Sequence, residues 1–229
     1  MTKKNYSVVI PAAGIGQRMA ADCPKQYLKI LGQPMLSYSV KPFLSLDCIH
    51  QIVIALSADD HWFKTLELAN HPKVKTVIGG ADRVHSVMAA LETIAPDDWV
   101  LVHDAARPCL SQRELVAIIE AAERDQGAIL ACPVRDTMKR SNAQRVIETT
   151  INRDYLWHAQ TPQSFACQIL LNNIRGALKA GVNMTDEASA MEWAGYPVEL
   201  IPGSHDNIKV THPEDLSLAE FLISRQQRS

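Results

Sequence analysis

A loop of small residues follows the first apolar run of the chain and carries the first candidate chemistry. Ser7–Ile10 leads directly into Pro11-Ala12-Ala13-Gly14-Ile15-Gly16-Gln17-Arg18-Met19. Small side chains let backbone N–H groups approach phosphates closely. Met19 replaces the third glycine of the dinucleotide fingerprint, and no Walker A lysine follows. The flanking cations Arg18 and Lys25 suit a triphosphate better than a dinucleotide, although an ordinary turn with solvated cations explains this loop equally well.

A polar cluster follows another apolar run, where a core would otherwise continue. His103-Asp104-Ala105-Ala106-Arg107 comes directly after Trp99–Val102. Ligands of open α/β sheets bind at the carboxyl ends of strands. A single carboxylate there can hold Mg²⁺, which takes its other ligands from waters and phosphates. We therefore favour a functional role for Asp104 and Arg107 over the capping of a turn, and a structural role for His103.

Two further segments are weaker candidates. Gly79–Ser86 is a glycine turn between an apolar run and a helix, so its backbone groups and the Ser86 hydroxyl can read a base edge. A plain strand-to-helix connection is as good an explanation. Asp206-Asn207-Ile208-Lys209 offers a carboxylate and a cation beside a short strand. Taken alone, Asp206 and Lys209 are better explained as a surface charge pair.

The elements that must position these residues alternate between strands and helices. The predicted strands are Ser7–Ile10, Gln51–Leu56, Lys75–Ile78, Trp99–Val102 and Ala128–Cys132. Runs this apolar are typical of parallel strands that are covered on both faces. Amphipathic helices are expected at Val84–Ile94 and Arg113–Arg124. The alternation predicts a Rossmann-like α/β fold, with a mostly parallel sheet and helices on both faces.

Three helix starts are marked by capping patterns. They are Ser57-x-x-Asp60, Ser111-x-x-Glu114 and Thr211-x-x-Glu214. A serine or threonine followed by an acidic residue three positions later satisfies free N–H groups at a helix start. The last pattern predicts a C-terminal helix to about Ser224.

The segment 134–160 breaks the alternation and is rich in arginine. Thr149-Thr150-Ile151 indicates a strand and Ser141-Asn142 a turn. We favour a β-hairpin arm over a long surface loop, because long loops without structure are uncommon in compact domains. The rest of residues 1–229 is expected to form one domain that carries this arm.

Composition excludes several classes of protein. The 229 residues have a formal net charge of −2, so no basic excess exists to neutralise a nucleic-acid backbone. The five cysteines are widely spaced and lack a CxxC, which disfavours disulfides and zinc and fits a reducing compartment. Neither a signal peptide nor a membrane span is expected. The sequence predicts a cytoplasmic protein.

Taken together, the motifs resemble those of a known enzyme family. In order they are PAAGIGQRM, CPKQYL, GG-x-x-R-x-x-S, VHDAARP, PVRDTMKR, TDEAS and DNIKVT. This set resembles the 2-C-methyl-D-erythritol 4-phosphate cytidylyltransferases of the non-mevalonate isoprenoid pathway, from Val8 to about Phe221. The resemblance implies transfer of a cytidylyl group from CTP to methylerythritol phosphate, with Mg²⁺ as cofactor. It also implies a homodimer in which the arm completes the partner's site.

The resemblance assigns roles to individual residues. The nucleotide-binding residues it implies are Ala12, Ala13 and Gly14 in the triphosphate loop, and Gly80, Ala81 and Ser86 at the cytosine. The catalytic cations are Arg18, Lys25 and Lys209, and the metal residues are Asp104 and, more weakly, Asp206. The acceptor contacts are Arg107, Thr185 and, from the partner's arm, Thr137 and Arg153. At position 81 many members of the resembled family carry an acidic residue, whereas here Ala81 precedes Asp82.

Other functions fit the sequence less well. A nucleotidyltransferase for a different phosphorylated acceptor is disfavoured by Thr137, Arg153 and Thr185, which resemble the acceptor site specifically. A regulatory nucleotide-binding protein without catalysis is disfavoured because Arg18, Lys25, Asp104 and Lys209 occur together. A dinucleotide-dependent oxidoreductase is excluded by the missing third glycine.

Overall fold

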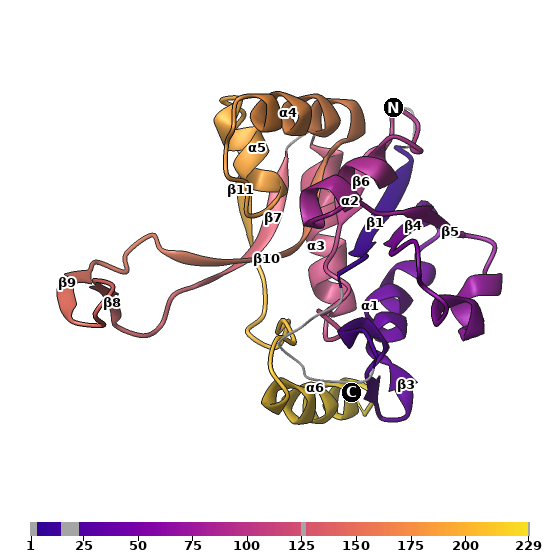
Figure 1. The fold of residues 1–229 in the computed structure, drawn as a ribbon, viewed down its shortest axis with the longest axis horizontal. Coiled ribbons are helices and arrows are strands. Elements are labelled where there is room, and N and C mark those ends of the chain that lie inside the picture. Colours follow the sequence, from indigo (N-terminus) through magenta and orange to yellow (C-terminus); the bar gives the residue numbers. More distant parts are fainter. Residues whose placement is uncertain (1–3, 15–22, 125–126, 229) are drawn as a thin grey trace.

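The computed structural model describes residues 4–14, 23–124 and 127–228 and is built around one seven-stranded sheet (Figure 1). The strand order is β11-β7-β10-β6-β1-β4-β5. The strands are β1 (Tyr6–Ala12), β4 (Ile49–Leu56), β5 (Val74–Ile78), β6 (Trp99–Val102), β7 (Ala128–Pro133), β10 (Trp157–Ala166) and β11 (Glu199–Pro202). All five predicted strands are confirmed. Four of them are largely buried, whereas the edge strand β5 is partly exposed.

Strand β10 runs antiparallel to its neighbours β6 and β7 in an otherwise parallel sheet. Its sequence, WHAQTPQSFA, has no apolar run, and it was not predicted as a strand. Gln163 pairs with Val102, so the residues just before Gln163 lie beyond the carboxyl end of β6. This strand therefore brings polar side chains to the edge of the sheet where a site is expected.

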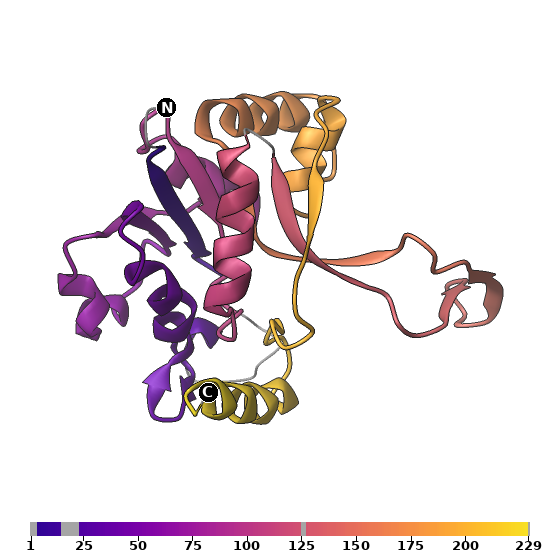
Figure 2. The same ribbon diagram turned by 180° about the vertical axis from the view of Figure 1, so that it is seen from behind.

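Helices cover both faces of the sheet, which confirms the predicted fold class. Helices α1 (Met35–Leu44) and α3 (Gln112–Glu123) pack on one face, and α3 faces the viewer in Figure 2. Helices α2 (Arg83–Leu91), α4 (Cys167–Lys179) and α5 (Glu187–Trp193) pack on the other. Alternate residues of β1 point into the two cores, with Val8 and Ile10 on one side and Val9 on the other.

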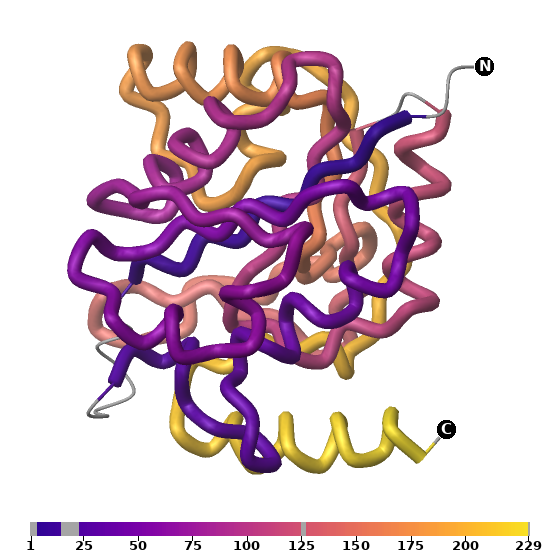
Figure 3. The backbone as a smooth tube through the Cα atoms, turned by 90° about the vertical axis from the view of Figure 1, so that its right-hand side faces the viewer, coloured from indigo at the N-terminus to yellow at the C-terminus, as the bar shows by residue number. Residues whose placement is uncertain are grey.

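A third apolar cluster holds the C-terminal helix against the carboxyl edge of the sheet. Helix α6 (Glu214–Gln226) is the yellow helix along the lower side of Figure 3. Its Ala219 and Leu222 belong to one buried apolar cluster with Met35 and Ala106. Within the described part of the chain, no helix is long and apolar enough to cross a membrane.

The three predicted helix starts have different outcomes. Ser111 and Glu114 form the expected capping box at α3. No α-helix begins after Ser57; instead Asp60 accepts hydrogen bonds from the backbone of the short 3₁₀ turn η3 (Phe63–Thr65). The C-terminal helix exists, but its expected capping box is wrong. Asp215, not Glu214, accepts from the backbone N–H of Thr211, at 2.8 Å, because α6 begins three residues after that threonine.

The segment between β7 and β10 projects from the body of the molecule (Figures 1 and 2). Its outer part is a hairpin of β8 (Met138–Ser141) and β9 (Ile147–Ile151), which confirms the predicted strand at 149–151. Asn142 closes the turn by accepting from the backbone of Val146 at 3.0 Å. Because β7 ends and β10 begins at the carboxyl edge of the sheet, the arm leaves the body from the same edge as the predicted site.

Candidate functional site

A pocket of about 200 Å³ is lined in large part by the segments that follow the carboxyl ends of β1, β5 and β6. Segments that are far apart in the sequence form its wall, and most of the predicted nucleotide and charge residues lie among them. The predicted residues in the lining are Ala12, Ala13, Gly14, Lys25, Gly80, Ala81, Ser86, Asp104 and Lys209. Parallel strands explain this gathering, because their carboxyl ends all reach one edge of the sheet.

Two glycines bring the wall segments close together. A Cβ on Gly79 would lie 2.6 Å from the Cβ of Ala13, and a Cβ on Gly80 would lie 2.3 Å from the Cβ of His85. Only glycine permits so close an approach. The Ser86 hydroxyl accepts from the Gly80 backbone N–H at 3.2 Å and so fixes the turn.

The start of α2 is closed by its own side chains. Asp82 is the N-cap residue and accepts from the backbone N–H of His85 at 3.1 Å. The backbone and the imidazole of His85 hold the pKa of Asp82 below its ordinary value, despite a smaller opposing effect of burial. Asp82 therefore has a structural task at the helix start, and Ala81 precedes it with no polar side chain.

The turn that carries Lys25 is anchored by three contacts. The short 3₁₀ helix η2 (Lys25–Tyr27) contributes Lys25 and Gln26 to the pocket lining. Gln26 donates to the Ala12 carbonyl at 2.7 Å, and the Tyr27 hydroxyl donates to Asp60 at 2.6 Å. The Lys25 ammonium also reaches the carbonyl of Val210 at 3.4 Å. These contacts join the Lys25 turn to the end of β1 and to the segment after Lys209.

Asp104 is the centre of a buried charge cluster. Its Oδ1 accepts from Nε of Arg83 at 3.0 Å, and its Oδ2 lies 2.8 Å from Nζ of Lys209. Nε of Arg107 lies 3.6 Å from the same Oδ2. Burial alone would raise the pKa of Asp104, but Arg83 and Lys209 hold this pKa far below its ordinary value. Asp104 is therefore an ionised carboxylate at the pocket wall.

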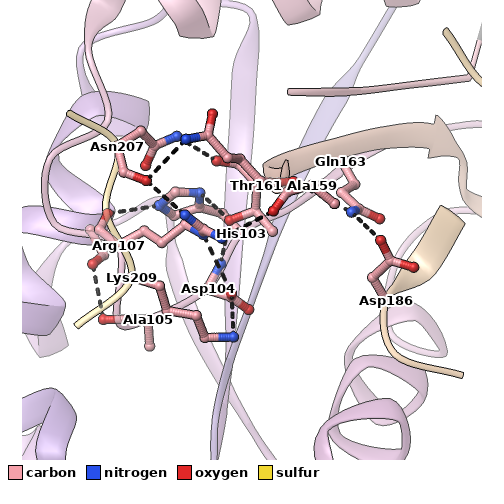
Figure 4. A network of polar contacts seen from close by, with 12 residues as sticks. His103, Asp104, Ala105, Arg107, Ala159, Thr161, Gln163, Asp186, Asn207 and Lys209 are labelled. Carbon is pink, nitrogen blue, oxygen red and sulfur yellow. Dashed lines mark hydrogen bonds and ion pairs between the residues drawn. The ribbon is translucent and has the colours of Figure 1, made fainter. Parts of the chain in front are cut away.

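A neutral histidine fixes the loop that carries Asp104 (Figure 4). Burial lowers the pKa of His103 to about 4, so the ring is uncharged at neutral pH. Its Nε2 lies 3.1 Å from the carbonyl of Arg107, which only accepts, so Nε2 carries the proton. Nδ1 then accepts from the Thr161 hydroxyl at 3.0 Å, and Thr161 accepts from the Asp104 backbone N–H at 3.0 Å. This closed network supports the structural role predicted for His103.

The Arg107 guanidinium lies behind the pocket wall and joins three segments. Its Nη1 donates to the carbonyl of Asn207 at 2.7 Å, and its Nη2 donates to the carbonyl of Ala159 at 3.3 Å. Asn207 in turn donates to the carbonyl of Thr161 at 2.9 Å. Figure 4 shows these residues converging from β10, the loop after β6 and the loop after β11. The network fixes the position of the Lys209 segment beside Asp104.

Comparison with known proteins identifies the family. Residues 6–225 match the model of IspD, 2-C-methyl-D-erythritol 4-phosphate cytidylyltransferase. The chain belongs to this family. A protein of that name from Shewanella oneidensis is 52% identical over 222 residues, which cover 96% of this chain and 89% of the relative. One from Vibrio vulnificus is 50% identical over 224 residues, which cover 96% and 94%. The crystal structure of IspD from Francisella tularensis aligns with a TM-score of 0.83 and 35% identity, covering 96% of this chain and all of that one.

The other described residues expected from the resemblance to the IspD family lie outside the pocket lining. Arg18 falls outside the described residues. Thr137 and Arg153 lie on the exposed arm, and Thr185 is exposed before α5. Asp206 forms an ion pair with Arg225 of α6. The roles of these residues and of Arg107 remain predictions.

Sequence reasoning missed two charged residues of the site. Arg83 lines the pocket, and both terminal nitrogens of its guanidinium donate to Glu187, at 2.5 and 2.9 Å. Arg83 was visible as the arginine of the GG-x-x-R-x-x-S motif, and Glu187 as the glutamate of TDEAS. Their pairing spans 104 positions, and no local pattern in the sequence signals it.

Proposed function

We propose that this chain transfers the cytidylyl group of CTP to 2-C-methyl-D-erythritol 4-phosphate, giving 4-diphosphocytidyl-2-C-methyl-D-erythritol and pyrophosphate. The observation that carries the proposal is the family match over residues 6–225. The pocket supports it, because a small-residue loop, two lysines and an ionised carboxylate line one cavity at the carboxyl edge.

The acceptor supplies its own nucleophile. A phosphate monoester has a second pKa of roughly 6, so it is mostly a dianion at neutral pH. An oxygen of this phosphate attacks the α-phosphorus of CTP, and the bond to the departing pyrophosphate breaks. No general base is needed in this reaction, which agrees with the neutral and fully engaged His103.

The chemical difficulty is the meeting of two anions. Fixed cations are needed to offset the charge of the triphosphate and of the incoming phosphate during an in-line displacement. In the proposed mechanism Lys25 and Lys209, which both line the pocket, hold phosphate oxygens together with Arg18. The backbone N–H groups of Ala13 and Gly14 add donors that leave room for the phosphates.

A divalent cation, which we propose to be Mg²⁺, fits the donors at the pocket. Asp104 offers an ionised carboxylate in the lining. In the described ranges no group of three or more histidine, cysteine, aspartate or glutamate side chains could hold a metal. A lone carboxylate matches Mg²⁺, which commonly takes one or two protein carboxylates together with phosphates and waters. Bound there, the cation would supply charge neutralisation of the phosphates. Asp206 is a weaker candidate for a second ligand, because Arg225 already pairs with it.

Base recognition in this proposal relies on the glycine turn. Gly80, Ala81 and Ser86 line one end of the pocket. With alanine at position 81, contacts to cytosine from that residue come from backbone groups. The tight packing around Gly80 holds those groups in place.

The acceptor site is proposed to form between two subunits. Arg107 and Thr185 belong to the body, whereas Thr137 and Arg153 lie on the projecting arm. The arm exposes large apolar side chains, among them Val146 at 60% and Tyr155 at 96%. Apolar surface of this kind is typical of a protein interface. We therefore propose a homodimer in which each arm covers the partner's pocket and brings Arg153 to the acceptor phosphate.

Pyrophosphate release tests the proposed function. The protein is mixed with Mg²⁺, each of the four ribonucleoside triphosphates, and methylerythritol phosphate or another polyol phosphate. Release with CTP and methylerythritol phosphate alone is the expected result. Equally fast release with a different acceptor would contradict the proposed substrate. CTP binding without release under any condition would contradict catalysis.

A further inference from the structure

An ion pair between Arg83, which is 29% exposed at the pocket, and the buried Glu187 adjoins the Asp104 carboxylate and has no part in the mechanism above. Arg83 is the first residue of α2, and Glu187 is the first residue of α5. Nη1 of Arg83 lies 2.5 Å from Oε1 of Glu187, and Nη2 lies 2.9 Å from Oε2. The Glu187 side chain is only 2% exposed. This two-pronged pairing is the strongest geometry available to an arginine and a carboxylate.

The same guanidinium also contacts Asp104 through its remaining nitrogen. Nε of Arg83 donates to Oδ1 of Asp104 at 3.0 Å, whereas Oδ2 faces Lys209, whose side chain is 39% exposed. Arg83 is therefore shared between two carboxylates. Oδ1 of Asp104 is bound by the Arg83 guanidinium, whose other two nitrogens are held by Glu187. Oδ2 is paired with Lys209, a partly exposed lysine that can turn towards a phosphate.

The charges of this cluster decide which ions can join it. Arg83, Arg107 and Lys209 face Asp104 and Glu187, so the cluster as described carries a net charge of +1. Without the negative charge of Glu187, the positive charge of Arg83 would be balanced by Asp104 alone. The net charge of the cluster would then be +2. A more positive cluster attracts polyphosphate anions and repels a metal cation.

We propose that Glu187 is a positioning residue for the nucleotidyl transfer, which neutralises Arg83 and thereby leaves the Asp104 carboxylate able to hold a divalent cation. This inference rests on the proposed function, because it assumes that a metal–nucleotide complex occupies the pocket. It assigns to the TDEAS segment a task in metal binding that involves no contact with the metal.

The inference predicts effects of opposite sign in one variant. In Glu187→Gln, CTP binding without metal is unchanged or tighter, because the pocket is more positive. The Mg²⁺ factor, which is the ratio of CTP affinities with and without Mg²⁺, falls about three- to tenfold. This is the order expected when the charge of Glu187, one side chain away from Asp104, is removed. A purely structural role for Glu187 would instead weaken CTP binding under both conditions.

The experiment is calorimetric titration of the full-length protein with CTP, once with EDTA and once with saturating Mg²⁺. Glu92→Gln is the matched control. Its partner Arg175 lies 2.7 Å away, but both side chains are about half exposed, and such pairs contribute little. We expect the Mg²⁺ factor of Glu92→Gln to equal that of the wild type.

A double variant separates charge from folding. Arg83→Gln/Glu187→Gln removes one charge of each sign and restores the net charge of +1, and losing both partners of a buried pair is better tolerated than losing one. Its Mg²⁺ factor should return towards the wild-type value. The inference is overturned if the factor stays as low as in Glu187→Gln, or if Glu187→Gln folds and shows an unchanged factor. Should Glu187→Gln not fold, a double variant that folds but has lost the Mg²⁺ factor overturns it as well.

The outcome is independent of the reaction itself. A wild-type protein that binds CTP more tightly with Mg²⁺ but releases no pyrophosphate would overturn the proposed transfer reaction, and the Mg²⁺ factor of Glu187→Gln would still test the effect of Glu187 on metal binding. A normal reaction combined with an unchanged Mg²⁺ factor in Glu187→Gln would overturn only the inference.

Discussion

Lys209→Ala removes an ammonium group that lies 2.8 Å from Oδ2 of Asp104 at the wall of the pocket. The substitution has one expected effect on kcat and another on the free energy of unfolding, and the structure indicates the size of each. The first is the loss of a cation that, in the proposed mechanism, offsets the developing charge of the transferred phosphate. Removing one such preorganised contact typically lowers kcat by about 10²–10³, or about 3–4 kcal/mol.

The second effect concerns stability and is much smaller. At this distance an ion pair is worth about 6 kcal/mol in a medium with an effective dielectric constant of about 20. Lys209 is 39% exposed, however, and Arg83 still pairs with Asp104 in the variant. Solvent screening and this remaining partner reduce the expected loss to at most about 1 kcal/mol. The variant should therefore fold almost normally and turn over very slowly.

Pyrophosphate release and urea unfolding measure the two effects on one preparation. Lys179→Ala is the control, because Lys179 is an exposed lysine at the end of α4. Its kcat and stability should match those of the wild type. A kcat for Lys209→Ala close to that of the control would refute a role in catalysis. A large fall in kcat together with unfolding would mean that Lys209 supports the fold instead.

Three further predictions use other parts of the structure. Arg153→Ala chains mixed with Lys25→Ala chains should regain partial pyrophosphate release. One of the two sites in each heterodimer then keeps both Arg153 and Lys25. Heterodimers that show no recovery would place the site within one subunit. Gly80→Ala should weaken CTP binding in calorimetry by about 1–3 kcal/mol, because the new Cβ would lie 2.3 Å from the Cβ of His85; unchanged affinity would remove this turn from the nucleotide site. Burial raises the pKa of Cys167 from 9.0 to about 11, so the unfolded thiol ionises first as the pH rises and the folded state loses about 2–3 kcal/mol between those values. Urea unfolding of Cys167→Ala should lack that part of the alkaline loss, and identical pH profiles would contradict the burial of this thiol.

Sequence patterns predicted those strands and helix ends that depend only on residues close together in the chain. The runs at β1, β4 and β6 contain enough consecutive apolar residues that only a strand covered on both faces buries them. Ser111 and Glu114 cap α3 through bonds within one turn of chain, so their spacing alone predicted the helix start. Asp215 shows the limit of this approach, since either of two adjacent acidic residues can reach Thr211 and only the path of the backbone selects one.

Strand β10 was missed because its burial depends on partners elsewhere. Gln160 and Gln163 are buried, yet they are polar. Gln163 accepts from the backbone of Ala188 and donates to Asp186, and Gln160 donates to the carbonyl of Ser204. Hydrogen bonds to distant segments offset the loss of water for these amides. A pattern of apolar residues contains no record of such partners.

The sequence by itself determined the class of fold and the family, because apolar runs and ordered motifs are set by residue type and spacing along the chain. It also placed Asp104 at a strand end, where parallel strands gather their ligands. Only the tertiary structure decided what Asp104 touches. Its two oxygens are divided between Arg83 and Lys209, and Glu187 backs Arg83 from a helix more than a hundred residues away along the chain. Electrostatic interactions act through space, so the charge of this site became known only once the chain was folded.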